Sequence, residues 1–271
     1  ESSRKALKHA TVRGQQPEPI FWGISMKAAS TDLWAKQEKQ LEKIRQKNKD
    51  NPEKLKRELE RQAARFRVRH NGPHYKDLST GATARVSWSY GGAKYAWKPS
   101  KARPKVPAAS RHVVVIPARQ KLIVELGNLV PDRGTLRVRV RASRVSVDKN
   151  KKRIPSLQLE FGWQASNDSA ASVRISNRDV VVDAVPEKPK FYQWDVPLSE
   201  IYPRNLMRKT AKMGGLPSPS EFVKLVNSSA SQGDIQIDHV EVIAPIYEKW
   251  PPDSPPRIFL DSSNKTDEPV Y

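Results

Sequence analysis

From about residue 80 to residue 246, apolar side chains recur at every second position in a series of short runs. In the clearest run, Leu136, Val138 and Val140 share one phase, and Arg137 and Arg139 share the other. In a β-strand, successive residues lie on opposite faces, so a pattern that repeats every second residue is typical of a strand with one apolar face. Turn-forming clusters separate the runs. About nine short strands with no long helix between them indicate a mainly β fold, an antiparallel β-sandwich of jelly-roll type.

The last of these runs, residues 235–246, does not keep its alternation. Ile235 and Ile237 are in phase with each other, but Val240 is not. A β-bulge at Asp238–His239 would shift the phase by one residue. Burial of the strand on both faces would explain the pattern equally well, and the sequence leaves both explanations open.

Residues 31–70 carry a helical pattern instead. Thr31 or Asp32 is a suitable N-cap, and Asn51 followed by Pro52 provides a second helix start. Apolar residues at helical spacing follow each start: Trp34, Leu41 and Ile44 in the first part, and Leu55, Leu59, Ala63 and Phe66 in the second. Because this apolar stripe is thin, we expect an inserted helical hairpin, or one kinked helix, that projects from the sandwich.

The remaining segments complete the predicted organisation of the chain. Residues 1–13 have the pattern of the end of a preceding helical domain, and residues 14–30 that of a connection with a first strand. The sandwich is expected to span residues 71–249. Residues 250–271 are rich in proline and are expected to form an extended linker to a following domain.

The positive charge is concentrated in one part of the chain. The whole sequence has 49 basic and 29 acidic residues, for a net charge of +20. Residues 1–153 account for +24 of this, and residues 154–271 for −4. A basic excess invites a nucleic-acid or polyanion partner. The basic excess is confined to the hairpin and the segments after it. A nucleic acid is therefore a less favoured partner than the others.

Two rows of arginines are the candidate polyanion-binding residues. Arg57, Arg61, Arg65 and Arg69 recur every four residues on the second predicted helix, and Arg137, Arg139 and Arg141 share one strand face. Either row could dock phosphates, an acidic protein or an acidic sugar. The simpler interpretation is a solvated helix face for the first row. For the second, it is an outer strand face on which neighbouring acids balance the charge.

Four aromatic residues are the candidate carbohydrate-binding residues. Trp88, Tyr90, Tyr95 and Trp97 lie within ten residues around a Gly-Gly turn. Aromatic faces beside polar loops can stack on sugar rings. Alternatively, Trp88 and Trp97 flank a strand pair and belong to the core.

The sequence gives little indication of a cofactor or of catalysis. The chain has no cysteine, which excludes disulfides, zinc ribbons, iron–sulfur sites and covalent haem c within it. Asp234, Asp238 and Glu241 offer oxygen ligands for a structural calcium ion. No familiar catalytic motif occurs, so we expect a non-catalytic chain. No apolar run approaches the length of a membrane span.

Several stretches resemble the central region of large, multi-domain planctomycete proteins that are associated with cytochrome c and have unknown function. The resemblance lies in "VPAASRHVVVIPARQKLIVELG", "VPDRGTLRVRVRAS", "PSPSEFVKLVNSS" and, most specifically, "IDHVEVIAPIYEKWPP".

The resemblance implies a jelly roll similar to carbohydrate-binding and galactose-binding modules. It places Asp238 and Glu241 at acidic closing-strand positions that such modules sometimes use for calcium. It also implies an extracytoplasmic location, with haem c only elsewhere in the parent chain.

Together these observations predict a non-catalytic module of a larger protein that binds a polysaccharide or docks the adjacent domains of its chain. A purely structural spacer and a polyanion binder are the alternatives.

Overall fold

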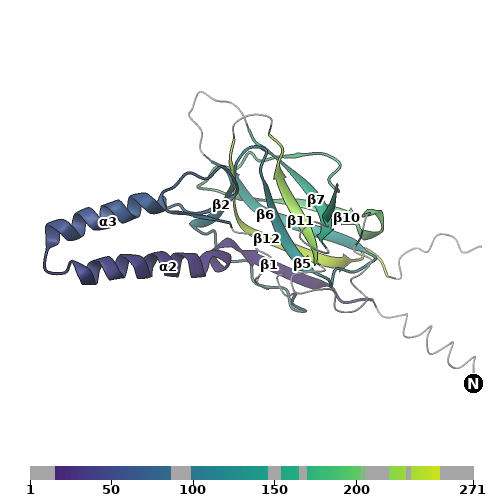
Figure 1. Cartoon of the computed structure of the whole chain (residues 1–271). Coiled ribbons are helices and arrows are strands. Elements are labelled where there is room, and N and C mark those ends of the chain that lie inside the picture. Colours follow the sequence, from purple (N-terminus) through teal and green to yellow (C-terminus); the bar gives the residue numbers. More distant parts are fainter. Residues whose placement is uncertain are drawn as a thin grey trace, which may run out of the picture.

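The computed structural model describes residues 16–86, 99–145, 154–164, 170–202, 204, 220–229 and 233–250. The described strands form two sheets in which every pair is antiparallel, and a helical hairpin extends from one end (Figure 1). Sheet A contains β1 (Ile20–Ser25), β2 (His74–Asp77), β3 (Thr83–Arg85), β4 (His112–Ile116), β6 (Thr135–Arg144), β10 (Lys190–Pro197) and β12 (Ile235–Ile246). Sheet B contains β5 (Lys121–Gly127), β7 (Ser156–Gln164), β8 (Ala170–Arg174), β9 (Val180–Val181) and β11 (Ser220–Asn227). A 3₁₀ turn, η1 (Leu198–Glu200), follows β10.

The core lies between the two sheets. Leu136, Val138 and Val140 of β6 are fully buried, as are Leu159 and Phe161 of β7. These are the residues that the period-two pattern assigns to the inner face. The predicted fold class, a mainly β antiparallel sandwich with an inserted helical hairpin, is confirmed.

A side-chain hydrogen bond also joins the two layers. The Trp22 indole of β1 is fully buried, and its Nε1 donates to the carbonyl oxygen of Leu126 in β5 over 3.2 Å. Burying an indole N–H without a partner would cost free energy, so this bond fixes where β1 lies over sheet B.

The long strand β12 runs through the middle of sheet A. On one side it pairs with β6, and on the other it pairs first with β4 and then with β1. Its register with β6 shifts between Ile237 and His239, and every residue from Ile235 to Pro245 is buried. Both explanations offered for the broken alternation are therefore correct. The sequence pattern missed β2, whose four residues have no apolar alternation.

The hairpin consists of α2 (Met26–Lys47) and α3 (Pro52–Phe66). The predicted second start is confirmed, because the Asn51 side chain accepts a hydrogen bond from the Lys54 amide over 3.0 Å. The predicted first start at Thr31 or Asp32 is wrong. Helix α2 begins directly after β1, because burial of Met26 and Ser30 against the sandwich stabilises an earlier turn.

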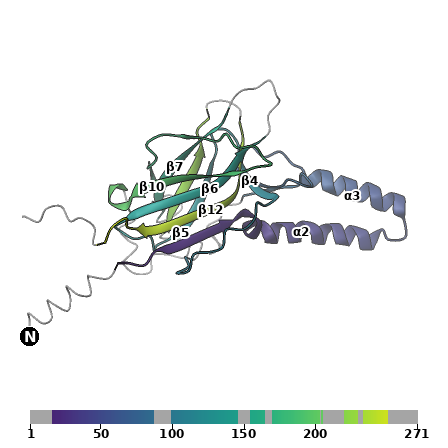
Figure 2. The ribbon, with the colours of Figure 1, turned by 180° about the vertical axis from the view of Figure 1, so that it is seen from behind.

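The hairpin projects from the sandwich, as both views of the molecule show (Figures 1 and 2). No residue of α3 is buried. Among the described helices, none is both long enough and apolar enough to cross a membrane.

Candidate functional site

A cleft of about 590 Å³ lies where the hairpin joins sheet A, and we name it the hairpin cleft. Its walls come from both helices, from the β2–β3 segment and from the start of β4. Its lining includes Trp34 and Gln37 of α2, with Asp77, Arg111 and His112 at the sheet.

Four hydrogen bonds fix the hairpin to the sheet at the base of this cleft, and in one of them the Thr83 hydroxyl donates to the Phe66 carbonyl of α3 over 3.0 Å. Gln37 Nε2 donates to the Thr83 carbonyl over 3.2 Å, and the Thr83 hydroxyl donates to the Val68 carbonyl over 2.6 Å. Arg67 Nε donates to the Thr80 carbonyl over 2.8 Å. Because both helices are tied to the same sheet edge, the walls of the cleft keep a fixed separation.

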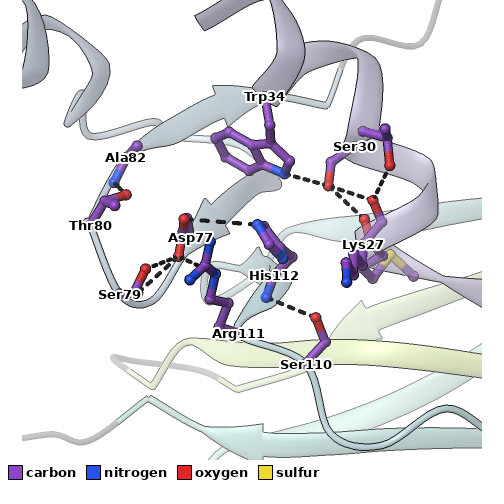
Figure 3. Close-up of polar contacts among 12 residues, drawn as sticks. Lys27, Ser30, Trp34, Asp77, Ser79, Thr80, Ala82, Ser110, Arg111 and His112 are labelled. Atoms are coloured by element: carbon purple, nitrogen blue, oxygen red, sulfur yellow. Dashed lines mark hydrogen bonds and ion pairs between the residues drawn. The ribbon is translucent and has the colours of Figure 1, made fainter. Parts of the chain in front are cut away.

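Trp34 is the main aromatic group of the cleft. Its Nε1 donates to the hydroxyl of fully buried Ser30 over 2.7 Å, and Ser30 donates in turn to the Met26 carbonyl over 2.6 Å (Figure 3). These two bonds hold the indole by its polar edge. The ring remains partly exposed in the cleft, with the His112 ring centroid 5.7 Å away.

Asp77 supplies a fixed negative charge beside the indole. Its Oδ1 accepts from the Ser79 amide over 2.9 Å and from the Ser79 hydroxyl over 2.7 Å, and Arg111 Nε lies 3.5 Å away. Burial acts to raise the pKa of Asp77, but the Ser79 bonds and the charge of Arg111 outweigh it and hold the pKa below its ordinary value. Asp77 is therefore an ionised acceptor at neutral pH.

His112 supplies a neutral ring. Burial lowers its pKa, and although the Asp77 carboxylate 3.8 Å away acts in the opposite direction, the net shift is downward. Its Nδ1 is buried and has no hydrogen-bond partner among the described residues. The cleft thus combines an aromatic ring with a carboxylate, a guanidinium and a neutral imidazole, a set that suits a ligand with both apolar faces and hydroxyl groups.

The first row of predicted arginines is only partly on the helix. Arg57, Arg61 and Arg65 are exposed on α3, and Arg61 pairs with Glu58 over 2.7 Å. The prediction that all four arginines lie on this helix is wrong for Arg69, because α3 ends at Phe66 and Arg69 belongs to the segment that leads into β2.

The second row has acidic partners on the neighbouring strands. Arg137 pairs with Asp195 of β10, Arg139 with Glu241 of β12, and Arg141 with Asp238 of β12. Glu241 also accepts from Arg103 over 2.9 Å, and Arg141 donates to the carbonyls of Pro107 and Ala108. This is the balanced outer strand face that the simpler interpretation described.

Those pairs also involve the carboxylates considered for calcium. Asp238 and Glu241 are hydrogen-bonded to arginines, and no group of three His, Asp or Glu side chains within the described ranges could hold a metal ion. Asp234, Asp238 and Glu241 are not brought together. Calcium binding at these residues therefore has no geometric support and stays a prediction.

The aromatic group Trp88, Tyr90, Tyr95 and Trp97 lies outside the described residues. The structure instead directs attention to Trp34, Asp77 and His112, which sequence reasoning did not single out as a site. The available signal was a tryptophan on a helix that is otherwise mostly charged. Its partners come from β2 and β4, and only the fold brings them together.

No protein-family model matches the chain. No curated protein matches it either. The resemblance to planctomycete proteins associated with cytochrome c therefore gains no support.

Solved structures show partial similarity. The CBM22-1 xylan-binding domain of Xyn10C from Paenibacillus barcinonensis is 9% identical, with a TM-score of 0.32 over 51% of this chain and 76% of that domain. A family 30 carbohydrate-binding module is 12% identical, with a TM-score of 0.31 over 55% and 75%. The K3 adhesin domain of Lys-gingipain from Porphyromonas gingivalis is 13% identical, with a TM-score of 0.27 over 54% and 81%. At these scores the function of the chain has to be inferred from its own residues.

Proposed function

We propose that this protein is a non-catalytic module that binds a polysaccharide chain in the hairpin cleft. The observation that carries the proposal is the partly exposed Trp34 indole, which is held by Ser30 beside Asp77 and His112 in a cleft of about 590 Å³. A volume of this size accommodates a few sugar rings.

The chemistry of the cleft matches that of a sugar ring. A pyranose has a face of C–H groups that can pack on an indole, and hydroxyl groups at its edge that need donors and acceptors. Trp34 offers the packing surface, Asp77 accepts, Arg111 donates, and the unpartnered Nδ1 of His112 gains a partner when a hydroxyl group reaches it.

The proposal is tested by measuring the affinity of the whole chain for neutral and acidic oligosaccharides by calorimetry. Xylo-oligosaccharides are a reasonable neutral probe. We expect Trp34→Ala to weaken binding about 5- to 150-fold, if packing of a sugar ring on the indole contributes as much as stacking of a nucleobase on an aromatic side chain, about 1–3 kcal/mol.

Lys36→Ala, an exposed change on the same helix outside the cleft, serves as the control and leaves the affinity unchanged. Binding that survives Trp34→Ala but is lost in Trp88→Ala or Trp97→Ala would move the site to the aromatic group predicted from the sequence. Failure to bind any polysaccharide would refute the proposal.

A docking role for the hairpin is a second candidate. It is favoured by α3, which projects from the sandwich (Figure 2) and contains no buried residue. A neighbouring domain of the same chain that packs on α3 would protect its amides from hydrogen exchange, and unchanged exchange in a longer chain would exclude this role.

A further inference from the structure

A second hollow, of about 410 Å³, lies across β2 from the hairpin cleft, because His74 and Lys76 line it on one face of the strand and Asp77 lines the cleft on the other. It is formed where the chain leaves α3 and enters β2, and Arg67 lines both hollows. We name it the basic pocket, after Arg67, Arg69, His70, His74 and Lys76, which line it. A ligand chain that leaves the cleft and turns over the sheet edge at Arg67 would place its next group at this pocket.

The cations of the basic pocket are not neutralised by the described residues. The lining has three basic side chains, Arg67, Arg69 and Lys76, against the single carboxylate of Asp234. Among the described residues, no carboxylate lies close enough to Arg69 or Lys76 to form an ion pair, for which the limit is 4.0 Å. This differs from Arg137, Arg139 and Arg141 of β6, each of which has an acidic partner on a neighbouring strand.

Two histidines add hydrogen-bonding groups to this charge. The rings of His70 and His74 lie 5.2 Å apart, and His74 Nδ1 is 3.0 Å from the Gly72 carbonyl, to which it donates. His70 Nε2 is buried and has no hydrogen-bond partner in the described part of the chain. A buried ring nitrogen without a partner carries a free-energy cost that a bound ligand can remove.

The charge around His70 favours an anion over a neutral group. Burial lowers the pKa of His70, and the nearby His74 and Arg85 lower it further. The ring is therefore neutral near pH 7 and can present an N–H at Nε2. An oxyanion would accept that hydrogen bond and would also interact with the unpaired cations.

We propose that the basic pocket binds an oxyanion substituent, a sulfate or carboxylate group, on the polysaccharide that occupies the hairpin cleft, so that the ligand is an acidic polysaccharide. This inference rests on the proposed function. Arg67, which lines both hollows, favours a charged sugar over a free anion, because a chain that turns over the sheet edge at Arg67 would contact Trp34 and the basic pocket together.

The test compares four probes on the whole chain by calorimetry: a neutral xylo-oligosaccharide, its glucuronate-substituted form, a sulfated oligosaccharide and inorganic sulfate. We expect at least one acidic oligosaccharide to bind about ten-fold more tightly than the neutral one. The double variant Arg69→Gln/Lys76→Gln should lose this preference and keep its affinity for the neutral probe.

The control is Lys56→Gln/Arg57→Gln, which removes the same charge from exposed positions on α3 and should keep the preference. Circular dichroism verifies that both variants fold. Because Arg69 is exposed, the single variant Arg69→Gln remains informative if the double variant unfolds, and it should lose part of the preference.

Inorganic sulfate separates the pocket from the cleft. In the wild type, sulfate should raise the pKa of His70 measured by NMR, since an adjacent anion stabilises the imidazolium, and it should have no such effect in the double variant. Sulfate binding without any effect of Trp34→Ala on sugar affinity would support the pocket and refute the proposed function.

Three outcomes would overturn the inference. The wild type could bind neutral and acidic oligosaccharides equally well. The control could lose the preference as fully as the double variant, which would assign the effect to the overall charge. Duplex DNA could bind more tightly than every oligosaccharide through Arg69 and Lys76, which would make the ligand a nucleic acid.

Discussion

Arg137 and Arg141 lie four residues apart on the same face of β6, yet their ion pairs differ in burial. The side chains of Arg137 and Asp195 are 35% and 39% exposed, whereas those of Arg141 and Asp238 are 10% and 4% exposed. Arg141 also donates to two backbone carbonyls of the segment before β4. The same residue type is therefore a surface group at one position and a buried structural group at the other.

This difference predicts unequal costs of removing each arginine. Arg141→Met leaves the Asp238 carboxylate buried with one remaining partner, the Ser110 amide, and should lower the free energy of unfolding by about 3–5 kcal/mol. Arg137→Met, its matched control, removes an exposed pair and should cost less than about 1 kcal/mol. Urea unfolding of both variants measures the difference, and equal costs would contradict it.

His239 predicts how stability depends on pH. The residue is 3% exposed, and its pKa is lowered by burial and by Arg141, an effect that Asp238 and Glu241 only partly offset. The unfolded chain binds a proton near the ordinary pKa of about 6.5, while folded His239 remains neutral to lower pH. The free energy of unfolding is therefore not reduced by this group above about pH 7, and it decreases as the pH falls through and below 6.5.

Urea unfolding between pH 7.5 and 5.5 tests this dependence. His70 and His112 also have lowered pKa values, so the wild type should lose stability on acidification through all three groups. His239→Gln should reduce the slope of the free energy of unfolding against pH by up to the amount that corresponds to one bound proton. An unchanged slope would show that His239 does not contribute.

At the residue scale, the sequence predicted which arginines share a face but not what they contact. Choosing between a binding surface and a balanced strand face required the register that places Glu241 opposite Arg139. Trp34 illustrates the same limit. Its helical spacing was visible in the sequence, but its neighbours Asp77 and His112 are 43 and 78 residues further along the chain.

Among the strands, β7 and β11 meet at a close approach that only glycine allows. A Cβ on Gly162 of β7 would overlap the Ala171 carbonyl oxygen and lie 2.5 Å from the ring of Phe222 in β11. Phe222 is paired directly with Gly162 and is 3% exposed. The ring therefore occupies the space that a side chain at position 162 would need.

Gly162→Ala should consequently lower the free energy of unfolding by about 1–3 kcal/mol, as overpacking of a core does. Gly72→Ala is the control, because a Cβ there meets nothing within 4 Å. It should leave stability within about 0.5 kcal/mol of the wild type. Thermal unfolding of the two variants distinguishes them, and a stable Gly162→Ala variant would mean that Phe222 can move.

At the element scale, the sequence predicted most strands because alternation and turn residues agree along them. It failed where tertiary contacts determine an element. Helix α2 begins at Met26 because Met26 and Ser30 pack on the sandwich, which overrides the better N-cap residues at 31 and 32. Strand β2 forms because β3 and β4 pair with it on both sides, a contact that its own four residues do not reveal.

For the whole molecule, local stability should be lowest in the hairpin. Helix α3 buries no residue, whereas β6 and β12 share the core. Amides of α3 should therefore exchange with solvent far faster than those of β12. Asn51→Ala should raise exchange in α3 further, about five-fold for a cap worth about 1 kcal/mol, and Asn51→Asp should leave it unchanged. Mass spectrometry after deuteration measures both, and slow exchange in α3 would contradict this view.

The uneven charge of the chain corresponds to distinct parts of the structure. In the basic first half, Arg137, Arg139 and Arg141 of β6 are balanced by acids from β10 and β12, which belong to the later, slightly acidic half. The hairpin and the basic pocket have no such partners in the described later strands. The net charge alone could not separate charge used for folding from charge available to a ligand.

The pairing of β1 with β12 places Ile20 beside Ala244. Because the two strands are antiparallel, a pulling force applied at residue 20 and at residue 246 acts at the same end of the ladder. The load would open the hydrogen bonds one after another, as a zipper opens, and would not shear them all at once. We therefore expect this sandwich to yield at low force when stretched through these positions, despite its extensive core.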